Sequence, residues 1–157
     1  MTDEALFIGI ATIAVVIAGF AGVTAGMEGS GGGWDGGQRL RQRAIVSTSF
    51  NVTFESMVPL VLFAMIGDER MSMVLASAGV ASYALLIVLV RGRQMLRARA
   101  MVSRAAQVMF VAGPLAAALF AANVVYFMSG GVFALALLVQ LSVAAISFYT
   151  LVSSTSS

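Results

Sequence analysis

The sequence predicts an all-α fold, a polytopic membrane helix bundle that forms a single transmembrane domain over residues 1–157. Three observations predict this fold: 60% of the residues are hydrophobic, only 10% are charged, and the apolar residues gather into long runs. A soluble domain carries about 25% charged residues, so an ordinary water-soluble fold is excluded. Crossing a hydrocarbon core of ~30 Å takes roughly 20 helical residues. We therefore expect five transmembrane helices, at residues 5–26, 44–66, 71–90, 105–128 and 132–152.

The first span is expected to be a retained helix, because Asp3 and Glu4 precede it where a signal peptide carries basic residues. It leads into a segment with seven glycines in residues 26–37. A phosphate-binding loop would need a preceding strand and a Gly-Lys-Ser/Thr ending, and both are missing. Glycine-rich composition instead favours a flexible loop at residues 27–38, which would leave the first helix free to pack away from the second.

The second span carries Glu55 near the bilayer midplane, where an ionised acid costs about 3 kcal/mol on insertion scales. Such a cost needs a structural or functional reason. At 100° per residue, Asn51 and Glu55 share a polar face, whereas Phe50, Phe54 and Met57 point the other way. We expect the polar face to turn into the bundle.

The third span ends at a segment, residues 91–104, that we expect to be an arginine-rich cytoplasmic loop. Its arginines would bind anionic lipid headgroups at about 1 kcal/mol each, or would serve only to fix the orientation of the chain. They flank membrane spans rather than a soluble basic domain, so nucleic acid is not an expected partner. The candidate headgroup ligands are Arg91, Arg93, Arg97, Arg99 and Arg104.

The distribution of arginine also predicts the orientation. Eight of the nine arginines lie in residues 39–43 or 91–104, the segments that precede the second and fourth spans. Positive residues collect on the cytoplasmic side. The expected protein is therefore a multi-pass protein of the cell membrane, with the N-terminus outside and the C-terminus inside.

The fourth and fifth spans supply a candidate hinge and a further polar residue. Gly113 and Pro114 adjoin in the fourth span, where proline removes one backbone hydrogen bond and allows a kink. Gln140 of the fifth span and Tyr83 of the third lie at about the depth of Glu55, on faces of small residues that permit close helix approach. The candidate intramembrane polar site is Asn51, Glu55, Tyr83 and Gln140.

Two interpretations of Glu55 stay open. A protonated carboxyl would hydrogen-bond neighbouring helices and fix their register, which favours a non-enzymatic structural or accessory bundle. A carboxyl that exchanges a proton or cation would instead serve a small proton- or ion-coupled transporter or channel, with or without a water-filled vestibule. We rank the structural role first, because no second acid or base accompanies Glu55, and we expect its carboxyl to be neutral at pH 7. Faces of small residues would allow a homo-oligomer or another membrane protein as partner.

Several chemistries are excluded because the chain has no Cys, His or Lys. Thiol nucleophiles, imidazole ligation of a metal or haem, and Schiff bases all need these residues. We therefore expect no catalytic residue, no metal site and no cofactor. A lipid-modifying enzyme would need an acid–base pair at the inner surface, and Glu28 and Asp35 in a glycine-rich segment are poor candidates.

The stretch FESMVPLVL at residues 54–62, followed by GDER at 67–70, resembles a family of small prokaryotic multi-spanning membrane proteins without assigned function. The closing stretch, from GVFAL at 131–135 to AAISF at 144–148, is similar to the same family. The resemblance covers residues 43–152. It implies helices and topology, and it assigns no catalytic residue.

Overall fold

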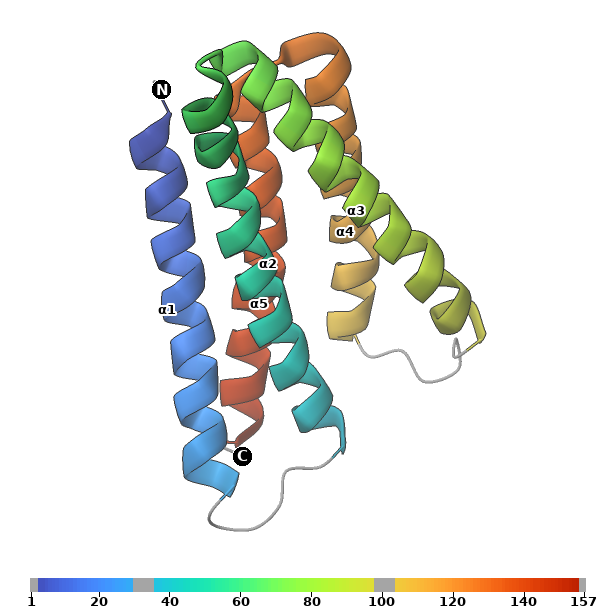
Figure 1. Ribbon diagram of the computed structural model, residues 1–157. Helices are drawn as coiled ribbons and strands as arrows, with labels where there is room; N and C mark the ends of the chain where they lie inside the picture. Colours follow the sequence, from blue (N-terminus) through green and yellow to red (C-terminus); the bar gives the residue numbers. More distant parts are fainter. Residues whose placement is uncertain (1–2, 30–35, 98–103, 156–157) are drawn as a thin grey trace.

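The computed structural model describes residues 3–29, 36–97 and 104–155, and this part of the chain is helical with no strand. The all-α prediction is confirmed. Figure 1 shows the order of the elements along the chain. They are α1 (Glu4–Gly29), α2 (Gly36–Ile66), α3 (Glu69–Arg97), α4 (Arg104–Ala122), the π-helical turn η2 (Asn123–Phe127) and α5 (Gly130–Thr155).

Four helices in the described residues are long and apolar enough to cross a membrane. This finding agrees with the prediction of a membrane protein with several transmembrane helices. A shorter apolar stretch of 16 residues, Ala112–Phe127, corresponds to the predicted fourth span. The four long stretches are Glu4–Thr24, Gln42–Ile66, Glu69–Ile87 and Gly130–Thr150.

The helices alternate in direction along one bundle axis (Figure 1). The N-terminus and the α2–α3 and η2–α5 turns lie at one end, and the C-terminus lies at the other. α1, α2 and α5 pack side by side, and α4 packs between α5 and α3. α3 touches α5 very little and leans away from α2 toward the end that holds the C-terminus, so the bundle opens on that side.

The helices extend into both segments that the sequence predicts to be loops. α1 runs to Gly29 and α2 begins at Gly36, so the proposed loop at 27–38 is helical at both edges; only residues 30–35 lie outside the described part. α3 likewise runs to Arg97, so the predicted arginine-rich loop at 91–104 is helical over most of its length. The physical reason is that a formed helix propagates at little cost. Arginine, glutamine, leucine and methionine in these flanks are good helix formers.

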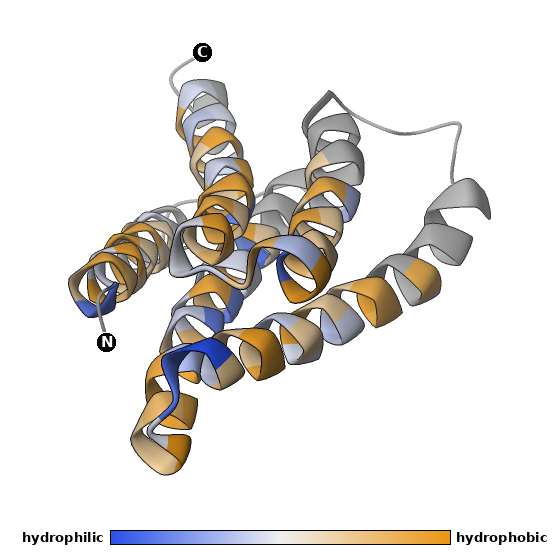
Figure 2. Cartoon of the chain, turned by 90° about the horizontal axis from the view of Figure 1, so that it is seen from above, coloured by the Kyte–Doolittle hydropathy of each residue, from blue (hydrophilic) through white to orange (hydrophobic). Residues whose placement is uncertain are grey.

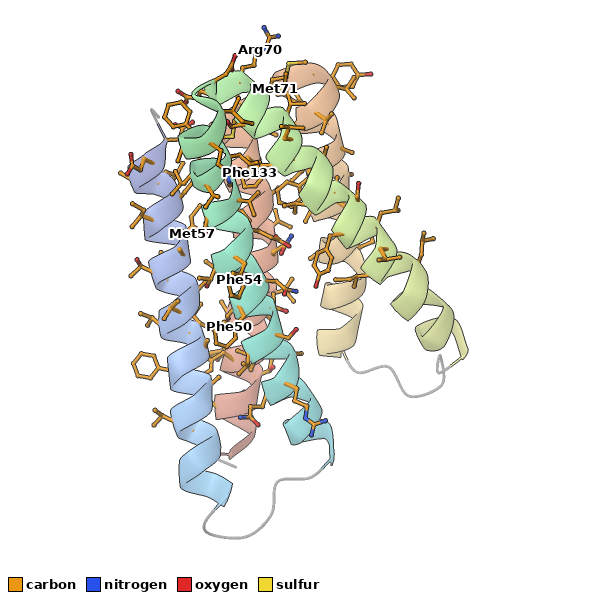
Figure 3. The ribbon with its side chains drawn as sticks, viewed as in Figure 1. Phe50, Phe54, Met57, Arg70, Met71 and Phe133 are labelled. Atoms are coloured by element: carbon orange, nitrogen blue, oxygen red, sulfur yellow. The ribbon has the colours of Figure 1, made fainter. Side chains whose placement is uncertain are left out.

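The core in the half of the bundle that holds the N-terminus joins α1, α4 and α5 through aromatic contacts. The Phe133 ring, labelled in Figure 3, meets Phe7 edge-on at a centroid distance of 5.7 Å and meets Phe120 at 5.0 Å. All three rings are fully buried. The expectation that the first helix is free to pack away from the second was wrong: α1 lies along α2 and α5. Burying an aromatic ring and its aliphatic neighbours outweighs the freedom of the connecting segment.

The bundle is apolar outside and carries small polar groups inside. Phe20, Phe54 and Met65 are more than 60% exposed, whereas Ser56, Ser72 and several further hydroxyl groups are fully buried. Figure 2, a view along the bundle, shows hydrophobic residues over the outward surfaces of the helices and hydrophilic colour at the α2–α3 turn. This arrangement is typical of proteins in the hydrocarbon core of a bilayer, where polar groups need hydrogen-bond partners within the protein.

The α2–α3 turn uses a glycine and an aspartate for distinct reasons. Gly67 adopts a φ of +76° and its N–H donates to the carbonyl of Phe63 at 2.8 Å, which ends α2. Asp68 then caps α3: its carboxylate accepts from the N–H of Met71 at 2.9 Å. Left-handed backbone favours glycine at the C-terminal end of a helix, and aspartate is a preferred N-cap.

Replacing Gly67 with alanine is expected to cost about 1 kcal/mol, because a Cβ is strained in the left-handed region. The matched control is Gly9→Ala in α1, where a Cβ would meet nothing within 4 Å and where alanine should stabilise the helix by about 0.5–1 kcal/mol. Thermal melts of the detergent-solubilised protein, followed by circular dichroism, measure both. The two variants should shift the Tm in opposite directions, and shifts of the same sign would refute this account of the turn.

The outer end of α4 is held by Asn123, which sequence analysis did not single out. Its side-chain amide donates to the hydroxyl of Ser77 on α3 at 2.9 Å, and its side-chain oxygen accepts from the N–H of Ser129 at 3.0 Å. Met128 follows η2 with a φ of 48° and donates its N–H to the Asn123 carbonyl at 2.8 Å. One buried residue therefore links α3, α4 and the start of α5.

Candidate functional site

Glu55 lies within α2, eleven residues before the C-terminal end of that helix at Ile66. Only 8% of its surface is exposed. Phe50 and Phe54 of the same helix, both labelled in Figure 3, are half or more exposed. The prediction that the acid faces inward while these rings face outward is therefore confirmed.

The two carboxyl oxygens of Glu55 have different surroundings. Gln140 of α5 is close enough to the carboxyl to interact with it. The Oε2 atom is buried and has no hydrogen-bond partner among the described residues. A buried polar atom left without a partner is costly, most of all in hydrocarbon. The carboxyl thus retains an unused acceptor, or a donor when it is protonated.

A cavity of about 400 Å³ borders Glu55 between α2 and α3. We call it the α2/α3 groove. Its size falls in the range of small-molecule sites in proteins, roughly 300–1,000 Å³. Apolar side chains and one glycine form most of its lining, and three polar side chains complete it. The lining residues are Asn51, Phe54, Glu55, Val58, Ala76, Gly79, Val80 and Tyr83.

The structure brings the four predicted polar residues to one region but gives them different positions. Asn51, Glu55 and Tyr83 line the α2/α3 groove, whereas Gln140 reaches the carboxyl from α5 and is not part of the lining. Tyr83 is 47% exposed, so it stands at the mouth of the groove rather than in its interior. The site is consequently an acid at the base of a cleft whose mouth lies on the outer surface of the helices.

The expected close approach of α3 through its small residues was wrong at Gly79. This residue is exposed, and a Cβ built there would meet nothing within 4 Å. The cause is the lean of α3 away from α2, which turns Ala76 and Gly79 into walls of the groove. Small residues here make room beside α2 instead of bringing the two helices together.

The predicted hinge at Gly113 and Pro114 lies within α4, which continues through the proline as helix. Pro114 is exposed and lines a second cleft of about 350 Å³ between α3 and α4, whose other walls are almost entirely apolar. The irregular backbone of this region lies further along, at η2 and Met128. A hinge role for Gly113 and Pro114 remains a prediction.

The candidate lipid-binding arginines lie at the end of the bundle that holds the C-terminus. Arg91, Arg93 and Arg97 belong to the last turns of α3 and Arg104 begins α4, while Arg99 lies outside the described residues. The side chains of all five are outside the described part of the chain. Binding of anionic lipid by this group therefore stays a prediction.

The chemistry that this arrangement supports is binding or proton exchange. Glu55 and Tyr83 are the titratable side chains of the α2/α3 groove, and Asn51 adds a neutral donor and acceptor. A carboxyl can release a proton and accept a cation, and it can take the proton back when the cation leaves. The groove lining thus offers one carboxyl, and the Tyr83 hydroxyl is the other titratable group in it.

No family model, curated protein or solved structure matches this chain. The resemblance to small prokaryotic multi-spanning proteins therefore remains an expectation, and the function has to be inferred from the groove and its carboxyl.

Proposed function

We propose that the chain crosses the cell membrane five times, with its N-terminus outside and its C-terminus inside. The alternating directions of the five helices support an odd number of crossings, and the shorter apolar stretch Ala112–Phe127 would serve as the fourth. The arginine-bearing ends of α2, α3 and α4 lie together at the end of the bundle with the C-terminus. Positive residues favour the cytoplasmic side, which gives the orientation.

Cysteine labelling tests this orientation cleanly, because the natural chain has no cysteine. Tyr126 is 79% exposed near the outer end of α4, so Tyr126→Cys should react with a membrane-impermeant maleimide added to intact cells. Ser154→Cys, near the C-terminus, should react only after the cells are permeabilised. The reverse pattern would overturn the proposed orientation, and reaction of both cysteines in intact cells would overturn the odd number of crossings.

We further propose that the protein is a small proton- or ion-coupled transporter or channel that uses Glu55. The observation that carries this proposal is a buried carboxyl that lines the α2/α3 groove and has one oxygen without a hydrogen-bond partner among the described residues. A carboxyl that served only to hold helices together would gain most from having both oxygens satisfied. An unused oxygen beside a cavity suits a group that binds and releases a proton or a cation.

A structural or accessory role is the second candidate, and the Gln140 contact favours it. A hydrogen bond between side chains of α2 and α5 would fix the register of two helices, as polar pairs do in membrane bundles. Such a role asks for donors and acceptors only. An amide supplies both, so Glu55→Gln separates the two candidates.

Reconstituted vesicles provide the test. Under an imposed pH gradient, we expect vesicles with the natural protein to pass protons at least tenfold faster than empty liposomes, as reported by a trapped pH-sensitive dye. Glu55→Gln should reduce that flux to the level of empty liposomes while leaving the circular dichroism spectrum and the Tm nearly unchanged. Flux that is absent in both proteins, or equal in both, would favour the accessory role instead.

A further inference from the structure

We propose that the α2/α3 groove binds apolar amines that enter from the bilayer, with the ammonium group against the Glu55 carboxylate. This inference names the ligand class of the site and rests on the proposed role of Glu55 as an exchanging group. Three features of the groove support it: the Glu55 carboxyl at its base, the apolar side chains of its walls and the position of its mouth.

The Glu55 carboxyl at the base of the groove favours a ligand that can supply a cation. Glu55 is the only charged residue between Arg43 and Asp68, and the sequences of α1, α4 and α5 carry no cation inside their apolar spans. The chain has no lysine at all, and the side chain that interacts with the carboxyl from α5, Gln140, is neutral. A ligand N–H at the Glu55 carboxyl, which lines the groove, would form a charge-assisted bond, and such a bond is stronger than a neutral one.

The walls of the groove select an apolar body for that ligand. Val58, Ala76 and Val80 offer hydrocarbon contacts, and the rings of Phe54 and Tyr83 border the cavity from opposite helices. Aromatic faces attract ammonium groups and pack well against flat apolar ligands. A sugar would leave most of its hydroxyl groups without partners, and a phosphate or carboxylate would find no cation among the lining residues.

The mouth of the groove faces the membrane interior. Phe54 is 69% exposed and Tyr83 is 47% exposed, so both rims lie on the lipid-facing surface of the bundle. Glu55 is about 16 Å below the outer end of α2, counted at 1.5 Å per residue. A ligand that reaches this depth sideways must dissolve in hydrocarbon, which a neutral apolar amine does and a water-soluble cation does not.

Binding would then proceed by one proton transfer. The neutral amine approaches the protonated carboxyl, the carboxyl O–H bond breaks, and the nitrogen lone pair forms the new N–H bond. An ammonium–carboxylate pair results, and the total charge of the groove stays at zero throughout. No co-reactant is needed, and no net charge is carried into the hydrocarbon.

Fluorescence titration of the protein in lipid nanodiscs tests this proposal, with 1-naphthylmethylamine as the probe and empty nanodiscs as the background. We expect saturable binding to the natural protein and at least a tenfold weaker affinity for Glu55→Gln. The neutral isostere 1-naphthalenemethanol has the same apolar body, so it should bind at least tenfold more weakly and should not distinguish the two proteins. Ser142→Ala, a change at an exposed position on α5, serves as the matched control and should bind like the natural protein.

The outcomes separate this inference from the proposed transport. Saturable amine binding that depends on Glu55, without proton flux, would support the amine site and refute the carrier. Proton flux that depends on Glu55, without saturable amine binding, would support the carrier and overturn the amine site. Equal binding of the amine and the alcohol would also overturn the inference, because it would reveal an apolar slot in which the carboxyl takes no part.

Discussion

Asn123→Leu is expected to destabilise the protein by about 2 kcal/mol, the largest loss among the single changes considered. Leucine has the same branching as asparagine but is larger, and it keeps neither the bond to the Ser77 hydroxyl nor the bond from the Ser129 N–H. Polar bonds between membrane helices contribute about 0.6 kcal/mol on average and at most roughly 2. The Ser129 N–H would also lose its side-chain acceptor, at a cost of about 1 kcal/mol.

Reversible unfolding of the purified protein in mixed micelles measures this loss. Ser142→Ala is a suitable control, because its hydroxyl makes only a local bond to the Val139 carbonyl at 2.7 Å on an exposed face; we expect a change within about 0.5 kcal/mol. A double-mutant cycle of Ser77→Ala with Asn123→Leu should show a coupling energy near the interhelical range of about 0.6–1.7 kcal/mol. Equal stabilities of Asn123→Leu and Ser142→Ala would show that the network contributes nothing.

The sequence carried enough information for the helices because hydrocarbon imposes a simple rule on them. Each span needs roughly 20 apolar residues in succession, and the predicted end of the second span at residue 66 coincides with the end of α2 at Ile66. The opposite end of this helix was missed by eight residues, because α2 begins at Gly36 and not at residue 44. Outside the hydrocarbon core, helix propensity and packing decide where a helix stops, and hydropathy no longer reports on either.

The part of the candidate site that lies on a single helix could be predicted from the sequence. Asn51 and Glu55 lie one turn apart, so a 100° repeat places them on the same face. Gln140 was found from its depth alone, and its contact with Glu55 agrees with that argument. The α2/α3 groove was not predictable in the same way. It depends on the lean of α3 relative to α2, a tertiary property that no local pattern encodes.

Asn123 shows where pattern reasoning fails for a second reason. It stands inside an apolar run, and the glycines at 130 and 131 mark the following turn more strongly than it does. The left-handed residue of that turn is nevertheless Met128, at a φ of 48°. The Asn123 carbonyl accepts a hydrogen bond from the N–H of Met128, and its side-chain oxygen accepts one from the N–H of Ser129. These two bonds occur where the backbone is left-handed. Such a contact is visible only once the chain has folded.

Gly79→Leu is expected to block the α2/α3 groove and to lower both proton flux and amine binding at least tenfold, with Glu55 left intact. The leucine side chain would start where a Cβ meets nothing within 4 Å and would occupy part of the 400 Å³ cavity. Filling open space creates no overlap, and replacing a mid-helix glycine should stabilise α3 by about 0.5–1 kcal/mol. Loss of activity would therefore come with an unchanged or raised Tm.

Gly9→Leu is the matched control, because Gly9 lies within α1, a Cβ there also meets nothing within 4 Å, and the residue is not part of the groove lining. It should raise helix stability to a similar extent while leaving flux and binding unchanged. Proteoliposome flux and nanodisc titration, run on the natural protein and on both variants, provide the measurements. Full activity in Gly79→Leu would show that neither protons nor amines reach Glu55 through this groove.

A series at position 79 separates occlusion from changes in helix stability. Alanine, valine and leucine increase in volume in that order, but their helix propensities rank alanine first, leucine second and valine last. If the α2/α3 groove is the path, activity should fall steadily from Gly79→Ala through Gly79→Val to Gly79→Leu, because each added methyl group removes space beside Glu55. If the stiffness of α3 controlled activity instead, valine would lie closest to the natural glycine and alanine furthest from it. The order of the three variants thus decides between a blocked groove and a stiffened helix.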